Sequence, residues 1–200
     1  TVGAGNVVSI IDDTVDFDAT AEKIVKSKVA NNSASCSSEN AVAIEECVYD
    51  EMISALQKVG GYLCTTEEGT RFLMVMGEKP GPEDRFSGEK ISLVLTVWKW
   101  TDYDEMINRI KAILKFSGEG HSVSLHSNKE ERQTKLALQL NVGRINCNMP
   151  HAMANSGSWF NSQPFTDSLG GGTWAKNNTS ENITWKHFLN YSWLSVPIKE

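Results

Sequence analysis

Short apolar runs alternate with amphipathic helical segments along most of this chain, and this order constrains the fold more than any other feature. The β-branched run at residues 7–11 precedes a segment, 21–29, whose apolar residues recur at helical spacing. The apolar run at 41–44 precedes a second helical pattern at 48–59, which two glycines would end. A strand followed by a helix, repeated in this way, is typical of parallel βα units.

The alternation continues through the middle of the chain. Apolar runs at 72–76 and 91–97 predict strands that a loop rich in proline and glycine separates. The next helix is expected to begin after Asp102, which would cap it. The buried face of this helix runs from Met106 to Leu114, and the remaining predicted elements are a helix at 130–140 and strands at 122–125 and 144–147. We therefore predict an α/β fold in which a mostly parallel sheet is flanked by helices on both faces.

The C-terminal quarter of the chain breaks this rhythm. Residues 148–182 are rich in glycine, serine and asparagine and predict an irregular loop region. Four aromatic side chains there require burial, which predicts that the region is ordered: Trp159, Phe160, Phe165 and Trp174. Segment 185–198 is aromatic and predicts a C-terminal strand that docks on a partner subunit. We divide the chain into a catalytic domain, 1–184, and a docking or oligomerisation segment, 185–200.

Charge and hydropathy limit the partners of the chain. Lysine and arginine total 19 against 25 aspartates and glutamates, so the formal net charge is −6, which gives no basic surface for a nucleic-acid backbone. No apolar stretch approaches the roughly 20 residues that span a membrane. Residues 1–20 contain four aspartates where a signal peptide would be basic and then apolar. We expect a cytoplasmic protein that binds neither nucleic acid nor a membrane.

The four cysteines form no CxxC pair, and a chain of this size does not need disulfides, so we expect free thiols. Cys36 lies in a loop of serines and asparagines, 31–40, between a predicted helix and a predicted strand. A thiol near backbone amides can have a lowered pKa and act as a nucleophile. The alternative is an inert cysteine in a serine-rich loop. Cys47, Cys64 and Cys147 are interpreted as packing residues.

The four histidines are scattered along the second half of the chain, at His121, His126, His151 and His187. No pair has the spacing of a zinc site, so no metal is expected. His121 lies beside a glycine at the start of a predicted strand, and His151 lies in the irregular loop. Either could act as an acid, as a base or as a hydrogen-bond donor to an anion. For each of them a structural role is the alternative.

Several short segments are uninformative singly but indicate a family when they are taken together. They are Gly3-Ala4-Gly5-Asn6 running into Ile10-Ile11-Asp12, Ser35-Cys36-Ser37-Ser38-Glu39-Asn40, Gly88-Glu89-Lys90-Ile91-Ser92, Gly118-Glu119-Gly120-His121, and the stretch from Pro164-Phe165 through Gly170-Gly171-Gly172 to Lys186-His187-Phe188. Their content and order resemble the CoA-acylating branch of the aldehyde dehydrogenase superfamily. The resemblance is to the catalytic part of succinate-semialdehyde, sulfoacetaldehyde and acetaldehyde dehydrogenases of that branch, and it covers nearly the whole chain.

The resemblance implies an oxidoreductase mechanism. The thiolate of Cys36 would add to a short aldehyde, hydride would pass to NAD or NADP, and the CoA thiol would attack the resulting thioester to give an acyl-CoA. The backbone amide of Cys36 would form part of the oxyanion hole. Glu89, by its place in the Gly-Glu-Lys-Ile-Ser segment, would accept hydrogen bonds from the nicotinamide ribose. His151, Asn155 and Ser156 are candidate donors for an anionic tail on the substrate.

The chain also departs from the family pattern. Family members carry an N-terminal half with the nucleotide-binding strands and a side-chain amide for the oxyanion hole, and we expect this chain to lack both. Hydrolytic relatives place a glutamate about where Thr1 stands, so Thr1 favours a thiol over water as the acyl acceptor and disfavours hydrolytic oxidation. The alternative function is a non-catalytic oligomerisation or interaction domain that retains the fold. The aromatic C-terminal segment predicts a homo-oligomer.

Overall fold

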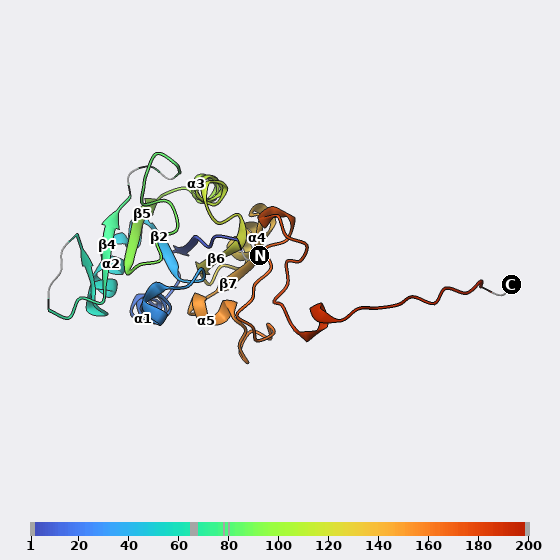
Figure 1. Ribbon diagram of the computed structural model, residues 1–200. Coiled ribbons are helices and arrows are strands. Elements are labelled where there is room, and N and C mark those ends of the chain that lie inside the picture. Colours follow the sequence, from blue (N-terminus) through green and yellow to red (C-terminus); the bar gives the residue numbers. More distant parts are fainter. Residues whose placement is uncertain (1–2, 65–67, 78, 80, 199–200) are drawn as a thin grey trace.

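The computed structural model describes residues 3–64, 68–77, 79 and 81–198. Its centre is one seven-stranded sheet in the order β3-β4-β5-β2-β1-β6-β7, and all neighbouring strands are parallel (Figure 1). The strands are β1 (Val7–Ile11), β2 (Glu39–Glu45), β3 (Gly61–Leu63), β4 (Phe72–Met76), β5 (Val94–Trp100), β6 (Gly120–His126) and β7 (Val142–Cys147). The prediction of a mostly parallel α/β sheet is confirmed.

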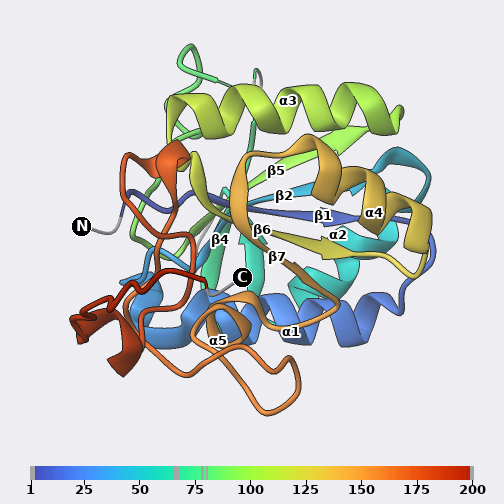
Figure 2. The ribbon, with the colours of Figure 1, turned by 90° about the vertical axis from the view of Figure 1, so that its right-hand side faces the viewer.

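Helices cover both faces of the sheet, as Figure 2 shows. They are α1 (Phe17–Val29), α2 (Tyr49–Lys58), α3 (Tyr103–Phe116), α4 (Glu130–Gln139) and α5 (His151–Asn155). Helices α1, α2 and α5 lie on one face, and α3 and α4 lie on the other. Asp102 caps α3 as expected, because its carboxylate accepts a hydrogen bond from the backbone N–H of Glu105 at 2.8 Å.

Strand β1, next to the central strand β2, separates two hydrophobic cores. Val8 and Ile10 face the core beneath α3 and α4, whereas Ile11 belongs to the core beneath α1 and α2. All three side chains are fully buried. A strand buried on both faces explains why the run at residues 7–11 is continuously apolar rather than alternating.

Two short elements escaped the sequence analysis. Strand β3 has three residues and α5 has five, and segments of this length are too short to show a hydrophobic period. Helix α5 lies inside the region that we expected to be irregular, where it packs against α1 and β7. Among the described residues, no helix has the length and apolar character needed to cross a membrane.

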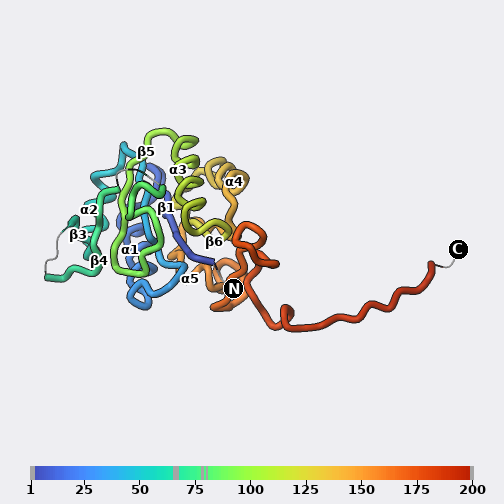
Figure 3. Tube along the Cα trace, turned by 45° about the horizontal axis from the view of Figure 1, so that its top comes forward, coloured from blue at the N-terminus to red at the C-terminus, as the bar shows by residue number. Residues whose placement is uncertain are grey.

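The predicted C-terminal strand is wrong. Residues Trp185–Phe188 form a 3-10 turn, and the described residues after it form no strand and extend away from the body of the protein (Figures 1 and 3). A strand requires a neighbour that pairs with its N–H and C=O groups, and no described segment of this chain lies beside it. Trp193 is 94% exposed.

The predicted burial of the loop aromatics is also wrong. Trp159 and Phe160 are 88% and 96% exposed, and Phe165 and Trp174 are exposed as well. Trp159 packs edge-on against Phe165, with ring centroids 5.3 Å apart, instead of entering a core. The loop is held by backbone hydrogen bonds and by asparagine side chains, such as the bond from Asn161 to the carbonyl of Ala154 at 2.8 Å.

Candidate active site

The candidate residues gather at one end of the sheet. Because all strands are parallel, their amino termini lie along the same edge, which we call the amino end. Cys36 lies in the loop before β2, Glu89 lies in the loop before β5, and His121 is the second residue of β6. The opposite edge, where β1, β2 and β6 end, is the carboxyl end.

The loop that carries Cys36 turns sharply after α1. Asn31 and Asn32 both adopt left-handed backbone conformations with φ of 54°, which asparagine tolerates better than most residues. The turn brings Cys36 against Gly5, where a Cβ atom would lie 1.9 Å from the carbonyl oxygen of Cys36. Only glycine fits at position 5, which explains a glycine just before β1.

Gly5 also connects this loop to Glu89. Its backbone N–H donates a hydrogen bond of 3.1 Å to the carboxylate of Glu89. Burial raises the pKa of Glu89, and the hydrogen bond from Gly5 lowers it in part. Among the described residues this is the one hydrogen bond to the carboxylate, which leaves it with free acceptor capacity.

The thiol of Cys36 does not have the lowered pKa that its polar loop suggested. Partial burial raises the pKa of Cys36, and the negative charge of Glu89 adds to this effect. A hydrogen bond with Ser37 and the positive charge of Arg144 act in the opposite direction. The expectation fails because it considered the polar loop alone and missed both the burial and the neighbouring carboxylate. All four cysteines are free, as expected.

His121 lies in a buried polar layer between β6, β7 and α5. Its Nδ1 is 2.7 Å from the hydroxyl of Ser122, and its Nε2 is buried without a partner among the described residues. Burial, with a contribution from the charge of Arg144, lowers the pKa of His121 to about 4, so the ring is neutral at neutral pH.

His151 and Asn155 belong to the same layer and are fully buried. The two ring nitrogens of His151 contact Asn146 at 3.2 Å and Ser122 at 2.9 Å. The amide of Asn155 contacts Ser37, Ser122 and Asn146. Since both side chains use their polar atoms within the protein, the prediction that they bind the anionic tail of a substrate is not supported.

Ser156, the third residue of that prediction, is half-buried at the end of α5. Its backbone carbonyl accepts a hydrogen bond of 2.9 Å from Thr166, and no contact to the polar layer comes from its side chain. The structure therefore brings together His121, His151 and Asn155, and it does not add Ser156 to them.

Arg144 is a site residue that the sequence analysis missed. It is 6% exposed and donates to the side-chain oxygen of Asn182 at 2.7 Å and to the carbonyl of Gly170 at 2.9 Å. Among the described residues, no carboxylate lies within ion-pair distance of its guanidinium group. The signal in the sequence was a single arginine inside an otherwise uncharged strand.

Two lysines, the buried Lys28 and the half-buried Lys90, hold the start of β2. The ammonium group of Lys28 donates to the carbonyl of Glu39 at 2.6 Å, and that of Lys90 donates to the carbonyl of Asn40 at 2.9 Å. Burial lowers the pKa of Lys28 to about 8 and that of Lys90 to about 7. The carboxyl group of Glu39 is fully buried, and no described residue makes a hydrogen bond of normal geometry to it. Burial raises its pKa to about 7, although a contact from Ser27 and the charge of Lys28 act in the opposite direction.

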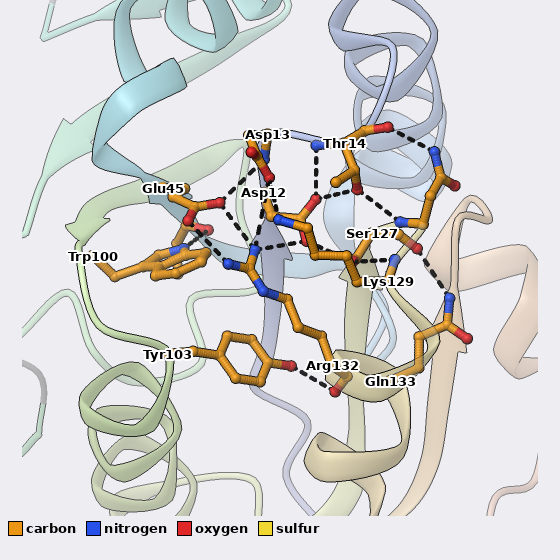
Figure 4. Close-up of polar contacts among 12 residues, drawn as sticks. Asp12, Asp13, Thr14, Glu45, Trp100, Tyr103, Ser127, Lys129, Arg132 and Gln133 are labelled. Atoms are coloured by element: carbon orange, nitrogen blue, oxygen red, sulfur yellow. Dashed lines mark hydrogen bonds and ion pairs between the residues drawn. The ribbon is translucent and has the colours of Figure 1, made fainter.

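The carboxyl end holds a different polar cluster, shown in Figure 4. Arg132 donates to the carboxylates of Asp12 at 2.8 Å and Glu45 at 3.0 and 3.1 Å. Its guanidinium group also lies 5.2 Å from the ring centroids of Trp100 and Tyr103. Asp12, Asp13 and Glu45 are close enough to share a cation, but Arg132 already supplies the positive charge.

Comparison with known proteins agrees with the fold. No protein-family model matches the chain. The chain is 36% identical to the acylating sulfoacetaldehyde dehydrogenase of Cupriavidus necator, over all of the chain and 48% of that protein. It is 33% identical to the acylating sulfoacetaldehyde dehydrogenase of Bilophila wadsworthia, over 98% of the chain and 51% of that protein.

This chain is related over its whole length to about half of an acylating aldehyde dehydrogenase. A solved acetylating aldehyde dehydrogenase of Geobacillus thermoglucosidasius has the same fold, with a TM-score of 0.90 at 21% identity, over 99% of the chain and 53% of that structure. The chain thus spans about half the length of the acylating dehydrogenases it matches. Thr1, on which the choice between thiol and water rests, lies outside the described residues.

Proposed function

We propose that this chain is the catalytic part of a CoA-acylating aldehyde dehydrogenase and that Cys36 is its nucleophile. The supporting observation is the position of Cys36 at the amino end of a sheet shared with acylating relatives, next to Glu89 and within the field of Arg144. The thiolate would add to the aldehyde carbon, and the backbone amide of Cys36 would stabilise the oxyanion. After loss of hydride, the thioester on Cys36 would transfer its acyl group to the CoA thiol.

NAD or NADP is the implied hydride acceptor. The carboxylate of Glu89 keeps free acceptor capacity beside its single hydrogen bond, which fits a role in accepting hydrogen bonds from the hydroxyl groups of a ribose. Bound there, the nicotinamide would supply the hydride-accepting carbon. The negative charge of Glu89 raises the pKa of Cys36, so a hydroxyl donor on Glu89 would weaken that effect and assist formation of the thiolate.

The substrates would be a short aldehyde and CoA, and we propose sulfoacetaldehyde or succinic semialdehyde as the first aldehydes to test. The names of the relatives support this choice. We further propose that the protein acts in the cytoplasm. The four free cysteines suit a reducing compartment.

Residues 185–200 would form the docking segment of a homo-oligomer. The side chains of Trp185, Phe188, Trp193 and Leu194 are each at least 68% exposed along a segment that leaves the body of the protein. Exposed apolar side chains in this density usually meet another protein surface. Truncation after residue 184 should turn the oligomer into a monomer in sedimentation analysis, and an unchanged mass would reject this role.

The decisive experiment uses the half-reaction that needs no nucleotide. Incubation with succinyl-CoA or acetyl-CoA should move the acyl group from CoA to Cys36, with release of free CoA, and the added mass should be visible in the intact protein. The variant Cys36→Ser should show no labile thioester, whereas Cys64→Ser should be acylated like the parent.

Nucleotide reduction at 340 nm then tests the full reaction. Aldehyde, NAD or NADP and CoA should give turnover that depends on CoA and is lost in Cys36→Ser. The test should be repeated with a protein that also contains the other half found in the relatives. If that protein shows neither acylation nor turnover, the enzymatic function is rejected and a non-catalytic interaction domain is supported.

A further inference from the structure

The orientation of one asparagine determines the tautomer of a buried histidine. The amide nitrogen of Asn146 donates to the amide oxygen of Asn155 at 3.0 Å and lies 3.2 Å from Nδ1 of His151. An amide nitrogen can donate but cannot accept, so Nδ1 of His151 must be the acceptor. Neutral His151 therefore carries its proton on Nε2.

The hydroxyl of Ser122 receives two hydrogen bonds. One comes from Nε2–H of His151 at 2.9 Å, and the other comes from the amide nitrogen of Asn155 at 2.8 Å. A hydroxyl oxygen accepts two hydrogen bonds and donates one. The proton of Ser122 must therefore point at its remaining neighbour, Nδ1 of His121, at 2.7 Å.

His121 is thus fixed in one tautomer. Its Nδ1 accepts from Ser122, so the proton of the neutral ring is on Nε2. That Nε2 is buried and has no partner among the described residues. A buried N–H without a partner is costly, and such groups occur where a ligand completes the hydrogen bond.

We propose that His121 is a hydrogen-bond donor to a carbonyl oxygen, an oxyanion or a thiolate, and not the base that removes a proton from the incoming thiol. Asn146, His151 and Ser122 are positioning residues, because they act through His121. This inference rests on the proposed function and assigns a role within the same site.

The donor role changes how the acyl group leaves Cys36. The incoming thiol loses its proton to solvent and attacks as a thiolate, a bond forms from its sulfur to the carbonyl carbon, and the electron pair moves to the oxygen. The oxyanion then collapses, and the bond to the sulfur of Cys36 breaks to leave its thiolate. His121 stabilises negative charge during these steps and gains no proton.

Nitrogen-15 NMR of the histidine-labelled protein tests the tautomer without any activity. At pH 7 we expect a proton on Nε2 of His121 and of His151. Ser122→Ala should remove the preference at His121, whereas Ser124→Ala should not, since Ser124 lies on the same strand and bonds to His126 and the carbonyl of Asn146 instead. A proton on Nδ1 of His121, which the opposite orientation of the two amides would give, overturns the inference.

A second test compares two replacements of His121 in acyl transfer from acetyl-CoA to Cys36. His121→Gln keeps an N–H donor but offers no base of comparable strength, so its rate should stay within roughly tenfold of the parent. His121→Leu removes the donor, and the rate should fall by about a hundredfold, the usual effect of losing one oxyanion donor. Equal loss in both variants contradicts a donor role.

The two tests separate this inference from the proposed function. If Cys36 is never acylated while His121 carries its proton on Nε2, the acylating function fails and the tautomer stands. If Cys36 is acylated and His121 carries its proton on Nδ1, the donor role alone fails.

Discussion

The two ends of the sheet handle buried polar groups in opposite ways. At the carboxyl end, Arg132 neutralises Asp12 and Glu45, and each carboxylate also accepts hydrogen bonds from neighbouring groups. At the amino end, Nε2 of His121 is buried and has no hydrogen-bond partner among the described residues, and none of them makes a hydrogen bond of normal geometry to the buried carboxyl group of Glu39. The cluster around Arg132 is completed by the chain itself, whereas the amino end keeps unused donors and acceptors, as a binding site does.

The largest effect should come from acidifying the buried histidines, of which His121 lies at the amino end of the sheet and His126 lies at the end of β6. In the folded protein, burial lowers the pKa of His121 to about 4 and that of His126 to about 3, and it lowers the pKa of His151 well below its usual value. The unfolded chain binds these protons near pH 6.5, so the unfolded state takes up more protons as the pH falls. Stability should be full above pH 6.5 and decline toward pH 4, by about 3 kcal/mol for His121 alone.

Urea unfolding between pH 7.5 and 4.5 measures this decline. The variant His151→Gln should show a shallower dependence on pH, and His187→Gln, on the exposed C-terminal segment, should match the parent. If His151→Gln retained the full slope, the neutral histidine layer would not be the source of acid sensitivity.

At the carboxyl end, the substitution expected to cost the most stability is that of Arg132, the cation at the centre of the cluster. Arg132→Met leaves two carboxylates near each other without their counter-ion, and removing one partner of a buried ion pair destabilises by about 3 to 4 kcal/mol. Chemical denaturation at pH 7 would measure the change. Lys129→Met breaks the more exposed pair with Asp13 and should lose no more than about 0.5 kcal/mol.

Equal effects of Arg132→Met and Lys129→Met would show that the cluster in Figure 4 is an ordinary surface network. Arg132→Met should also leave acylation of Cys36 unchanged at temperatures where the variant stays folded. Loss of acylation in the folded variant would mean that the two ends of the sheet are coupled, which contradicts the separation drawn here.

The sheet could be predicted well from the sequence because each long strand or helix shows its own pattern of apolar residues. The apolar runs at 7–11 and 72–76 match β1 and β4, and Asp102 caps α3 as the sequence predicted. The C-terminal strand failed because β propensity indicates that a segment can pair and does not say what it pairs with.

The candidate site was harder to predict, since its properties depend on contacts between distant segments. The polar sequence around Cys36 suggested a lowered pKa, whereas burial and the charge of Glu89, 53 residues away in the chain, raise it. Arg144 and Ser122 looked unremarkable because a single polar residue in a strand gives no periodic signal. The resemblance to acylating dehydrogenases indicated Cys36 and Glu89 as candidate site residues, and it gave no information on the polar layer around His121.

A smaller effect should come from Glu39, and it has the opposite sign to that of the histidines. Burial raises its pKa from 4.5 to about 7 in the folded protein, while the nearby charge of Lys28 favours the ionised form in part. As the pH rises, Glu39 loses its proton near pH 4.5 in the unfolded chain and near pH 7 in the folded protein. The contribution of Glu39 to stability is therefore present below pH 4.5 and is lost as the pH rises through 7. The loss amounts to at most about 3 kcal/mol.

Glu39→Gln should remove this loss, so the stability of the variant relative to the parent should rise between pH 5 and pH 7.5. Comparing each variant with the parent at both pH values isolates Glu39 from the histidines, whose contributions are common to both proteins. Glu22→Gln, on the exposed side of α1, is the control and should show no such rise. A constant difference for Glu39→Gln would mean that the carboxyl group is ionised in the folded protein.

The smallest effect concerns the reactivity of Cys36, and it tests the electrostatics of the amino end directly. Glu89 raises the pKa of the thiol and Arg144 lowers it, so Glu89→Gln and Arg144→Met should change the alkylation rate by iodoacetamide in opposite directions. Half a pKa unit corresponds to roughly a threefold change at neutral pH. Cys64 provides an internal reference in the same samples, and circular dichroism confirms that each variant is folded. Changes of the same sign in both variants would mean that loop opening, and not charge, controls access to the thiol, and the amino end would then owe its reactivity to burial alone.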